Sequence, residues 1–131
     1  MSTLLFAAVC SSPVLAEEDT PMMKEMEKSG KALKAMRKVD PSDWAALAAL
    51  AKESREAFLR SMSYEASVIE EMLDGKEKQI ASADSKRYLG LCYAALCELE
   101  IAYLKEDAAL VEAAIDSYKS LKSDGHDLYT E

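Results

Sequence analysis

The sequence predicts an all-α protein, an antiparallel up-down-up-down four-helix bundle. Only 4 glycines and 3 prolines occur in 131 residues, whereas a sheet protein of this size needs many turns. Apolar residues recur at helical spacing through most of the chain, and the connections between the predicted helices are short, which favours antiparallel neighbours. A chain of this length forms one domain with a single core.

The N-terminal segment 1–16 differs from the rest of the chain, because it carries no charge and includes an apolar run at 4–10. The letters VLA at 14–16 supply a cleavage site before an acidic stretch. We therefore predict a signal peptide at 1–16, a mature bundle domain at 17–131 and a periplasmic location. The apolar run is too short to span a bilayer as a helix, so no membrane span is expected.

Two helices are predicted in the first half of the mature chain. The first begins at Pro21, because proline suits an opening helical turn, and it ends near Lys38 before the break VDPSDW. The second is capped by Asp40 or Ser42 and continues as DWAALAALAKESREAFLRSM, with apolar residues at helical spacing. The pattern does not define where this second helix ends.

The second half contains a loop and two further helices. Segment 61–76 is predicted as a loop with one helical turn, closed by Asp74-Gly75. The third helix spans about 77–105, and Asp107 caps the fourth. The third helix is apolar nearly all round, so it presents a second apolar surface beyond its core face. This surface is either a homodimer interface or is covered by the loop, and the sequence leaves both open.

Charge and cysteine content restrict the function. The net charge of -8 repels phosphate backbones and no basic patch is visible, so we expect no nucleic acid partner but a partner protein with a basic face. Cys92 and Cys97 point about 140° apart on a helix, so they cannot form a disulfide with each other and are expected to be small buried side chains. No C-x-x-C-H motif occurs, which excludes covalent haem attachment.

The stretch PMMKEMEKSGKALKAM, at 21–36, holds four methionines and a glycine. At 100° per residue, Met26 falls at the centre of the predicted core-facing stripe and Gly30 lies on the same face. A glycine inside a helix costs about 1 kcal/mol relative to alanine, which suggests that a bulky flat group approaches the backbone. His126, the only histidine, lies at the edge of the core-facing stripe of the last helix. An antiparallel bundle brings Met26 and His126 to the same end.

These residues belong to motifs that resemble a known family. Met26-Glu27 followed by Leu33-Lys34, the break KVDPSDW and the second helix AALAALAKESREAF resemble the N-terminal half of soluble cytochrome b562. The C-terminal LKSDGHDLY, in which His126 precedes an aromatic residue by three positions, is similar to the end of that family. In that family the histidine is an axial haem ligand.

The first half also resembles the cytochrome c′ proteins, which share the fold, in its Met26-x-x-x-Gly30 pattern. The chain departs from them where Lys122 and Gly125 stand in place of the haem-attaching cysteines. The likeness covers nearly the whole mature chain, but it is poor over 61–85. It implies a periplasmic electron-transfer bundle that binds one non-covalent haem b. The resemblance makes Met26 and His126 the two axial ligands, with Met22 as a fallback for Met26.

Such a protein is not an enzyme, because both axial positions of the iron are occupied by protein. Two alternatives stay open. One is a haem-free bundle that acts as an envelope interaction or chaperone-like module. The other is a copper protein that uses Met22, Met23 and Met26 with His126, since thioethers select Cu(I). Hydrolytic or transferase chemistry has no support, because no nucleophile and base are paired.

Overall fold

The computed structural model describes residues 20–129 of the chain. Its elements are the helices α2 (Pro21–Ala35), α3 (Trp44–Ser61), α4 (Ser67–Glu70), α5 (Lys76–Leu104) and α6 (Ala108–Tyr129), with a 3₁₀ turn η1 (Met36–Lys38) after α2. Residues 20–129 contain no strand, so the predicted all-α class is confirmed. No helix within them is long and apolar enough to cross a membrane. The predicted signal peptide at 1–16 lies outside the described residues.

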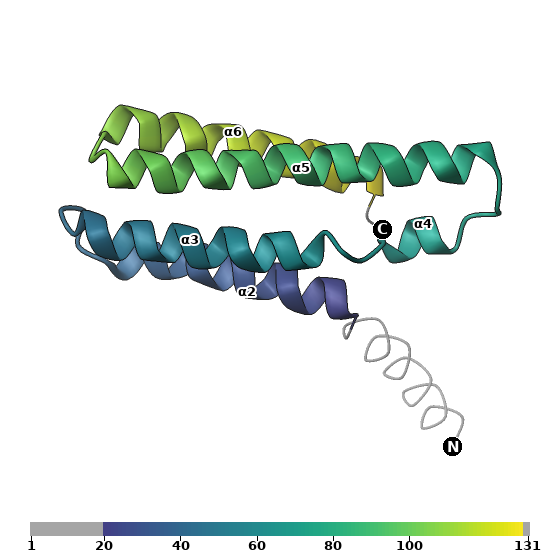
Figure 1. Ribbon diagram of the computed structural model, residues 1–131, viewed down its shortest axis with the longest axis horizontal. Coiled ribbons are helices and arrows are strands. Elements are labelled where there is room, and N and C mark those ends of the chain that lie inside the picture. Colours follow the sequence, from purple (N-terminus) through teal and green to yellow (C-terminus); the bar gives the residue numbers. More distant parts are fainter. Residues whose placement is uncertain (1–19, 130–131) are drawn as a thin grey trace, which may run out of the picture.

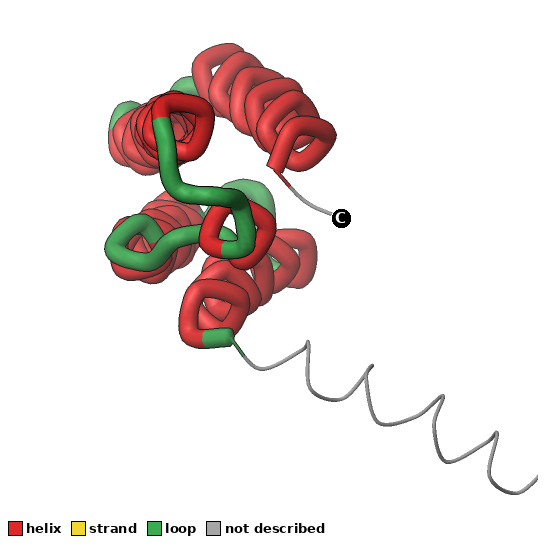
Figure 2. The backbone as a smooth tube through the Cα atoms, turned by 90° about the vertical axis from the view of Figure 1, so that its right-hand side faces the viewer, coloured by secondary structure: helices red, strands yellow, loops and turns green. Residues whose placement is uncertain are grey.

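The four long helices pack in chain order. Helix α2 packs on α3, α3 packs on α5, and α5 packs on α6. The chain reverses its direction between successive long helices, so the start of α2 and the end of α6 lie at the same end of the molecule (Figure 1). Viewed along the helices, α2 and α3 form one pair and α5 and α6 the other (Figure 2).

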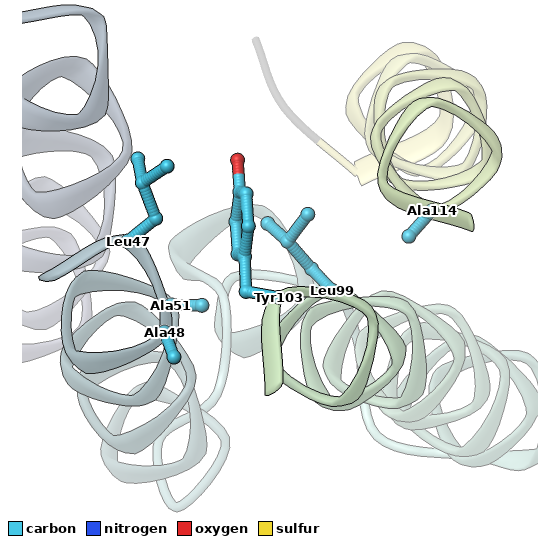
Figure 3. Packing of buried hydrophobic residues seen from close by; sticks show 6 residues of the cluster. All are labelled: Leu47, Ala48, Ala51, Leu99, Tyr103 and Ala114. Carbon is cyan, nitrogen blue, oxygen red and sulfur yellow. The ribbon is translucent and has the colours of Figure 1, made fainter. Parts of the chain in front are cut away.

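The core lies between α3 and α5 and is completed by side chains from the two outer helices. In one cluster, Leu99 and Tyr103 of α5 meet Leu47 of α3 (Figure 3). The other members of this cluster are Ala48, Ala51 and Ala114. A second cluster consists of Phe58, Cys92, Ala95, Leu96 and Tyr118. Each fully buried leucine of this kind contributes about 1.5–3 kcal/mol relative to an exposed one.

The cap of α3 differs from the prediction. Asp43 is the N-cap, since its carboxylate accepts a hydrogen bond from the Ala46 N–H at 3.2 Å. Asp40 and Ser42, the predicted caps, lie in the preceding turn, which the Asp43 N–H closes by donating to the Asp40 carbonyl at 2.9 Å. The Asp40 carboxylate accepts from the N–H and the hydroxyl of Ser42. These bonds, the backbone one first, hold the pKa of Asp40 below its usual value.

The predictions for the second half hold closely. Segment 61–76 contains one helical turn, α4, which buries Ile69. Gly75 then adopts a φ of 147°, a conformation that favours glycine, directly before α5 begins. Asp107 accepts hydrogen bonds from the N–H groups of Ala109 and Leu110, both at 3.1 Å, so its predicted role as the cap of α6 is confirmed.

Candidate functional site

The contact with α3 decides which face of α2 is buried. Its buried residues are Met22, Ser29 and Ala32. Ser29 meets Ser54 of α3, with the two Oγ atoms 2.9 Å apart. Met26 lies about 60° round the helix from Ser29 and is only half-buried. The prediction that Met26 stands at the centre of the core-facing stripe is therefore wrong, because α2 turns a serine towards its neighbour and Met26 lies at the edge of the buried face.

The remaining methionines at the start of α2 point to different sides. Met22 is buried, whereas 46% of Met23 is exposed. Gly30 is half-buried, and a Cβ built on it would meet nothing within 4 Å. The space beside Gly30 is thus open on the side of α2 that carries Met26, about 40° away round the helix.

The last turns of α6 are fixed on α5. A Cβ built on Gly125 would lie 3.5 Å from the Cβ of Tyr88, an ordinary packing contact. The rings of Tyr88 and Tyr129 meet edge to face with centroids 6.4 Å apart, and the Tyr129 hydroxyl donates to Asp84. Because Gly125 and Tyr129 face α5, His126 falls about 100° from Gly125 and is exposed.

The hydrogen bond between Tyr129 and Asp84, near His126, also affects the pKa values of both partners. The hydrogen bond from Tyr129, followed by the one from Arg87, keeps the pKa of Asp84 below its usual value. Burial, followed by the bond to Asp84, raises the pKa of Tyr129 to about 12. Tyr129 therefore remains a protonated donor at neutral pH, and it ties the end of α6 to α5.

The two predicted ligands share an end of the molecule but differ in burial. Met26 is half-buried near the start of α2, and His126 is exposed near the end of α6. Within residues 20–129, no three His, Cys, Asp or Glu side chains gather where they could hold a metal ion. Haem requires only two axial donors, because the porphyrin supplies the other four. A thioether and an imidazole form a donor set known for haem iron, so the chemistry of this pair fits that group.

The structure has a basic surface on α2 and η1, which the sequence analysis does not predict. We call it the α2 basic face, and its members are Lys24, Lys28, Lys31, Lys34, Arg37 and Lys38. They outnumber the two acidic residues of the same segment, Glu25 and Glu27. The three- and four-residue spacing of these basic residues could have predicted the surface. The net charge of -8 for the whole chain points instead to an acidic surface.

A groove of about 310 Å³ lies in the α2 basic face. Its lining residues are Pro21, Lys24, Glu25, Glu27, Lys28, Lys31 and Tyr64. Glu25 accepts from Arg60 Nε at 2.7 Å and from Lys28 Nζ at 3.0 Å. The bond from Arg60, followed by that from Lys28, lowers the pKa of Glu25. The negative charge of Glu25 is thus already matched by these two cations.

A second surface feature is apolar and lies on α5. Leu91, Ile101 and Leu104 are exposed, Leu104 by 65%. A groove of about 200 Å³ adjoins it, lined by Glu98, Ile101, Leu110, Ala113 and Ala114. Helix α4 lies near the opposite end of α5 from Leu104 (Figure 1). The alternative in which loop 61–76 covers this surface is therefore wrong for Leu91, Ile101 and Leu104, which are exposed. The homodimer stays a prediction.

The two cysteines of α5 are both free, as predicted. Cys92 is buried and Cys97 is half-buried. Burial raises the pKa of Cys92 to about 11, so this thiol stays protonated at neutral pH and behaves as a small apolar side chain.

Comparisons with known proteins identify no family. No family model matches the chain, and neither the curated proteins nor the solved structures include a significant match to it. The likeness to cytochrome b562 therefore depends on the motifs around Met26 and His126, and it stays a prediction.

Proposed function

We propose that this chain is a periplasmic electron-transfer protein that binds one haem b non-covalently in an antiparallel four-helix bundle. In this proposal Met26 and His126 are the axial ligands of the iron. One observation carries it: the start of α2 and the end of α6, which bear these two donors, lie at the same end of the molecule (Figure 1).

The surroundings of Met26 support a bulky neighbour. Helix α3 covers the Ser29 side of α2 and leaves Met26 at the edge of the contact. Gly30 adds backbone without a side chain on that edge, with open space beside it. A planar group that approaches α2 from this side would meet the thioether and little steric resistance.

The position of His126 also has a geometric basis. Ile115 lies about 20° from His126 round α6, three turns earlier. It packs against the core cluster that Leu33 and Met36 of α2 also contact. The side of α6 that carries His126 is therefore continuous with a side that packs on the core. The hydrogen bond from Tyr129 to Asp84 holds the last turn of α6, which carries His126, against α5.

Haem held in this way would supply a one-electron couple. The chain's own contribution is to occupy both axial positions, which excludes substrate from the iron, and to set the potential through a thioether ligand. The protein would thus carry electrons and catalyse no reaction by itself. Segment 39–129 has ten basic and eighteen acidic side chains, which supports a redox partner with a basic docking face.

The test is reconstitution of the purified protein with haemin, followed by absorption spectroscopy and potentiometry. We expect a low-spin b-type spectrum. His126→Ala should weaken haem retention most, because an imidazole binds iron more strongly than a thioether does. Met26→Ala should keep the haem, give a high-spin spectrum and lower the reduction potential.

Met23→Ala is the matched control, since Met23 is exposed on the same helix, and it should leave the spectrum unchanged. If Met22→Ala, rather than Met26→Ala, produces the high-spin spectrum, the ligand lies one turn earlier. If the wild type binds no haem, or if neither ligand variant changes the spectrum, the proposal is wrong.

A second candidate function is a haem-free interaction module of the cell envelope. The exposed apolar surface of α5, around Ile101 and Leu104, favours it, because contiguous exposed apolar groups mark interaction sites. In this case the protein retains no haemin after unbound haemin is removed. Sedimentation then shows self-association, which Ile101→Glu abolishes.

A further inference from the structure

Charge is segregated between α2 and the rest of the molecule. Segment 21–38 carries six basic and two acidic side chains, whereas segment 39–129 carries ten basic and eighteen acidic ones. A protein with a net charge of -8 thus has one segment, α2 together with η1, with a local excess of four positive charges. An anionic partner is therefore attracted most strongly to this segment.

The lysines of the α2 basic face have a regular spacing. Lys24, Lys28 and Lys31 fall within an arc of about 60° and cover about 10 Å along the helix axis. All three are exposed. Lys34, and then Arg37 and Lys38 in η1, extend the positive charge to the end of the segment. The result is a row of cations with the three- and four-residue spacing of a helix face.

The acidic residues of this helix do not neutralise the row. Glu25 is bound by both Arg60 and Lys28, and Glu27 pairs with Lys31 at 3.4 Å. Lys24 and Lys34 form no ion pair with any of residues 20–129. Exposed pairs such as that of Glu27 and Lys31 contribute little and exchange easily with a competing carboxylate.

We propose that the α2 basic face docks an acidic segment of a partner protein, in which carboxylates recur every three or four residues. The inference does not require bound haem. It also concerns a different surface, and a partner of opposite charge, from the basic redox partner of the proposed function.

The width of the basic face favours a narrow protein segment over other anions. Packed helices lie about 8–10 Å apart, a distance close to the Debye length of about 8 Å at physiological ionic strength. A membrane surface or a nucleic acid that extends past α2 would therefore meet the acidic segment 39–129 at short range. A single acidic helix, about 10–12 Å in diameter, can contact α2 alone.

The groove gives this surface a shape as well as a charge. It lies between the lysines of α2 and Tyr64, the exposed residue that follows α3. A carboxylate side chain in the groove would have Lys24 and Lys31 as cationic neighbours, beside Glu25 and Glu27, which are already paired with cations. The Tyr64 ring supplies an apolar wall with a hydroxyl at its tip.

The test uses a fluorescein-labelled helical peptide with glutamates at three- and four-residue spacing, titrated with the full chain and followed by anisotropy. Measurements at ionic strengths of about 0.01 and 0.15 M change the Debye length from about 30 to 8 Å. We expect the binding to weaken as salt is added. Duplex DNA and phosphatidylserine vesicles serve as the two competing anions.

Two charge variants with identical net charge separate the α2 basic face from general electrostatics. The first replaces Lys24, Lys28 and Lys31 by Glu, and the second makes the same change at three exposed lysines elsewhere, Lys52, Lys76 and Lys119. We expect the first to lose at least tenfold in affinity for the peptide and the second less than threefold. A third variant replaces Lys24, Lys28 and Lys31 by Gln and introduces no new repulsion within α2. Its loss of affinity for the peptide should be intermediate. It tests the proposal if the Glu variant does not fold.

Equal losses in the two charge variants would overturn the proposal, as would no loss in either of them. Tighter binding of DNA or of the vesicles than of the peptide, through the same three lysines, would also overturn it. That result would reassign the surface to polyanions.

Discussion

The hydroxyl of Ser54 donates a hydrogen bond to the backbone carbonyl oxygen of Ser29, 3.1 Å away, and the two Oγ atoms lie 2.9 Å apart. Both serines are almost completely buried. The Ser29 hydroxyl is therefore the donor between the two Oγ atoms, since the Ser54 proton is already used. This pair joins α2 to α3 between the buried faces of the two helices.

Ser54→Ala should lower the free energy of unfolding by about 1–2 kcal/mol, because the Ser29 hydroxyl loses its acceptor inside the interface. The measurement is urea unfolding followed by circular dichroism. Ser117→Ala, on the exposed side of α6, is the control and should change stability by less than about 0.5 kcal/mol. Equal effects of the two substitutions would show that the buried pair does not stabilise the contact.

The ion pair between Arg55 of α3 and Glu100 of α5 should be stronger than an exposed pair. Only 24% of the Arg55 side chain and 17% of the Glu100 side chain are exposed, and the bond to Glu100 raises the pKa of Arg55. A double-mutant cycle with Arg55→Met and Glu100→Gln should give a coupling energy of about 1–2 kcal/mol.

The matched cycle uses the exposed pair of Lys31 and Glu27, whose side chains are 72% and 67% exposed. Its coupling energy should stay below about 0.5 kcal/mol, because water screens the attraction. If the two cycles give the same coupling, partial burial does not strengthen the pair between α3 and α5.

Alkaline pH should destabilise the protein through Cys92. Burial raises the pKa of its thiol from 9.0 to about 11. Below pH 9 both the folded and the unfolded chain keep this proton, so its contribution to stability is complete. Between pH 9 and 11 only the unfolded chain loses the proton, so the free energy of unfolding falls by about 1.4 kcal/mol per pH unit.

Cys92→Ala should remove this part of the pH dependence, and urea unfolding at intervals between pH 8 and 11 measures it. Above pH 10 a further decrease should remain, because burial raises the pKa of Tyr118 from 10.0 to about 12. A variant with the wild-type slope between pH 9 and 10 would show that another group is responsible.

Lys86 of α5 should stabilise the end of α3. Its Nζ donates to the carbonyl oxygens of Met62, at 2.6 Å, and Tyr64, at 2.5 Å, which follow the last residue of that helix. Lys86→Met keeps most of the side chain but removes the charged donor, and it should cost about 1–2 kcal/mol. In this variant, hydrogen exchange should become faster at the last backbone amides of α3. The control is Lys119→Met at an exposed position of α6, and it should leave the exchange of these amides unchanged.

The sequence predicts the helices well because their periodicity and Asp107 are local signals. It predicts the cap of α3 poorly, since Asp40, Ser42 and Asp43 are all good caps and only the backbone bond that closes the turn decides among them. The hydrophobic pattern of α2 also points to Met26, whereas the buried face of the helix includes a serine, Ser29, which bonds to α3. A method that ranks positions by apolar character cannot find a helix contact of this kind.

Segment 21–38 has an excess of basic side chains and segment 39–129 an excess of acidic ones, so the charge of the molecule is distributed asymmetrically. Its net charge of -8 draws the protein towards an anode, yet the field near a negatively charged surface turns α2 towards that surface. Adsorbed molecules should therefore share one orientation on a carboxylate-coated electrode. In that orientation the lysines of α2 face the electrode, and Met26, about 160° from Lys28 round the helix, lies on the far side of α2. Voltammetry on such an electrode would address every molecule from the same side.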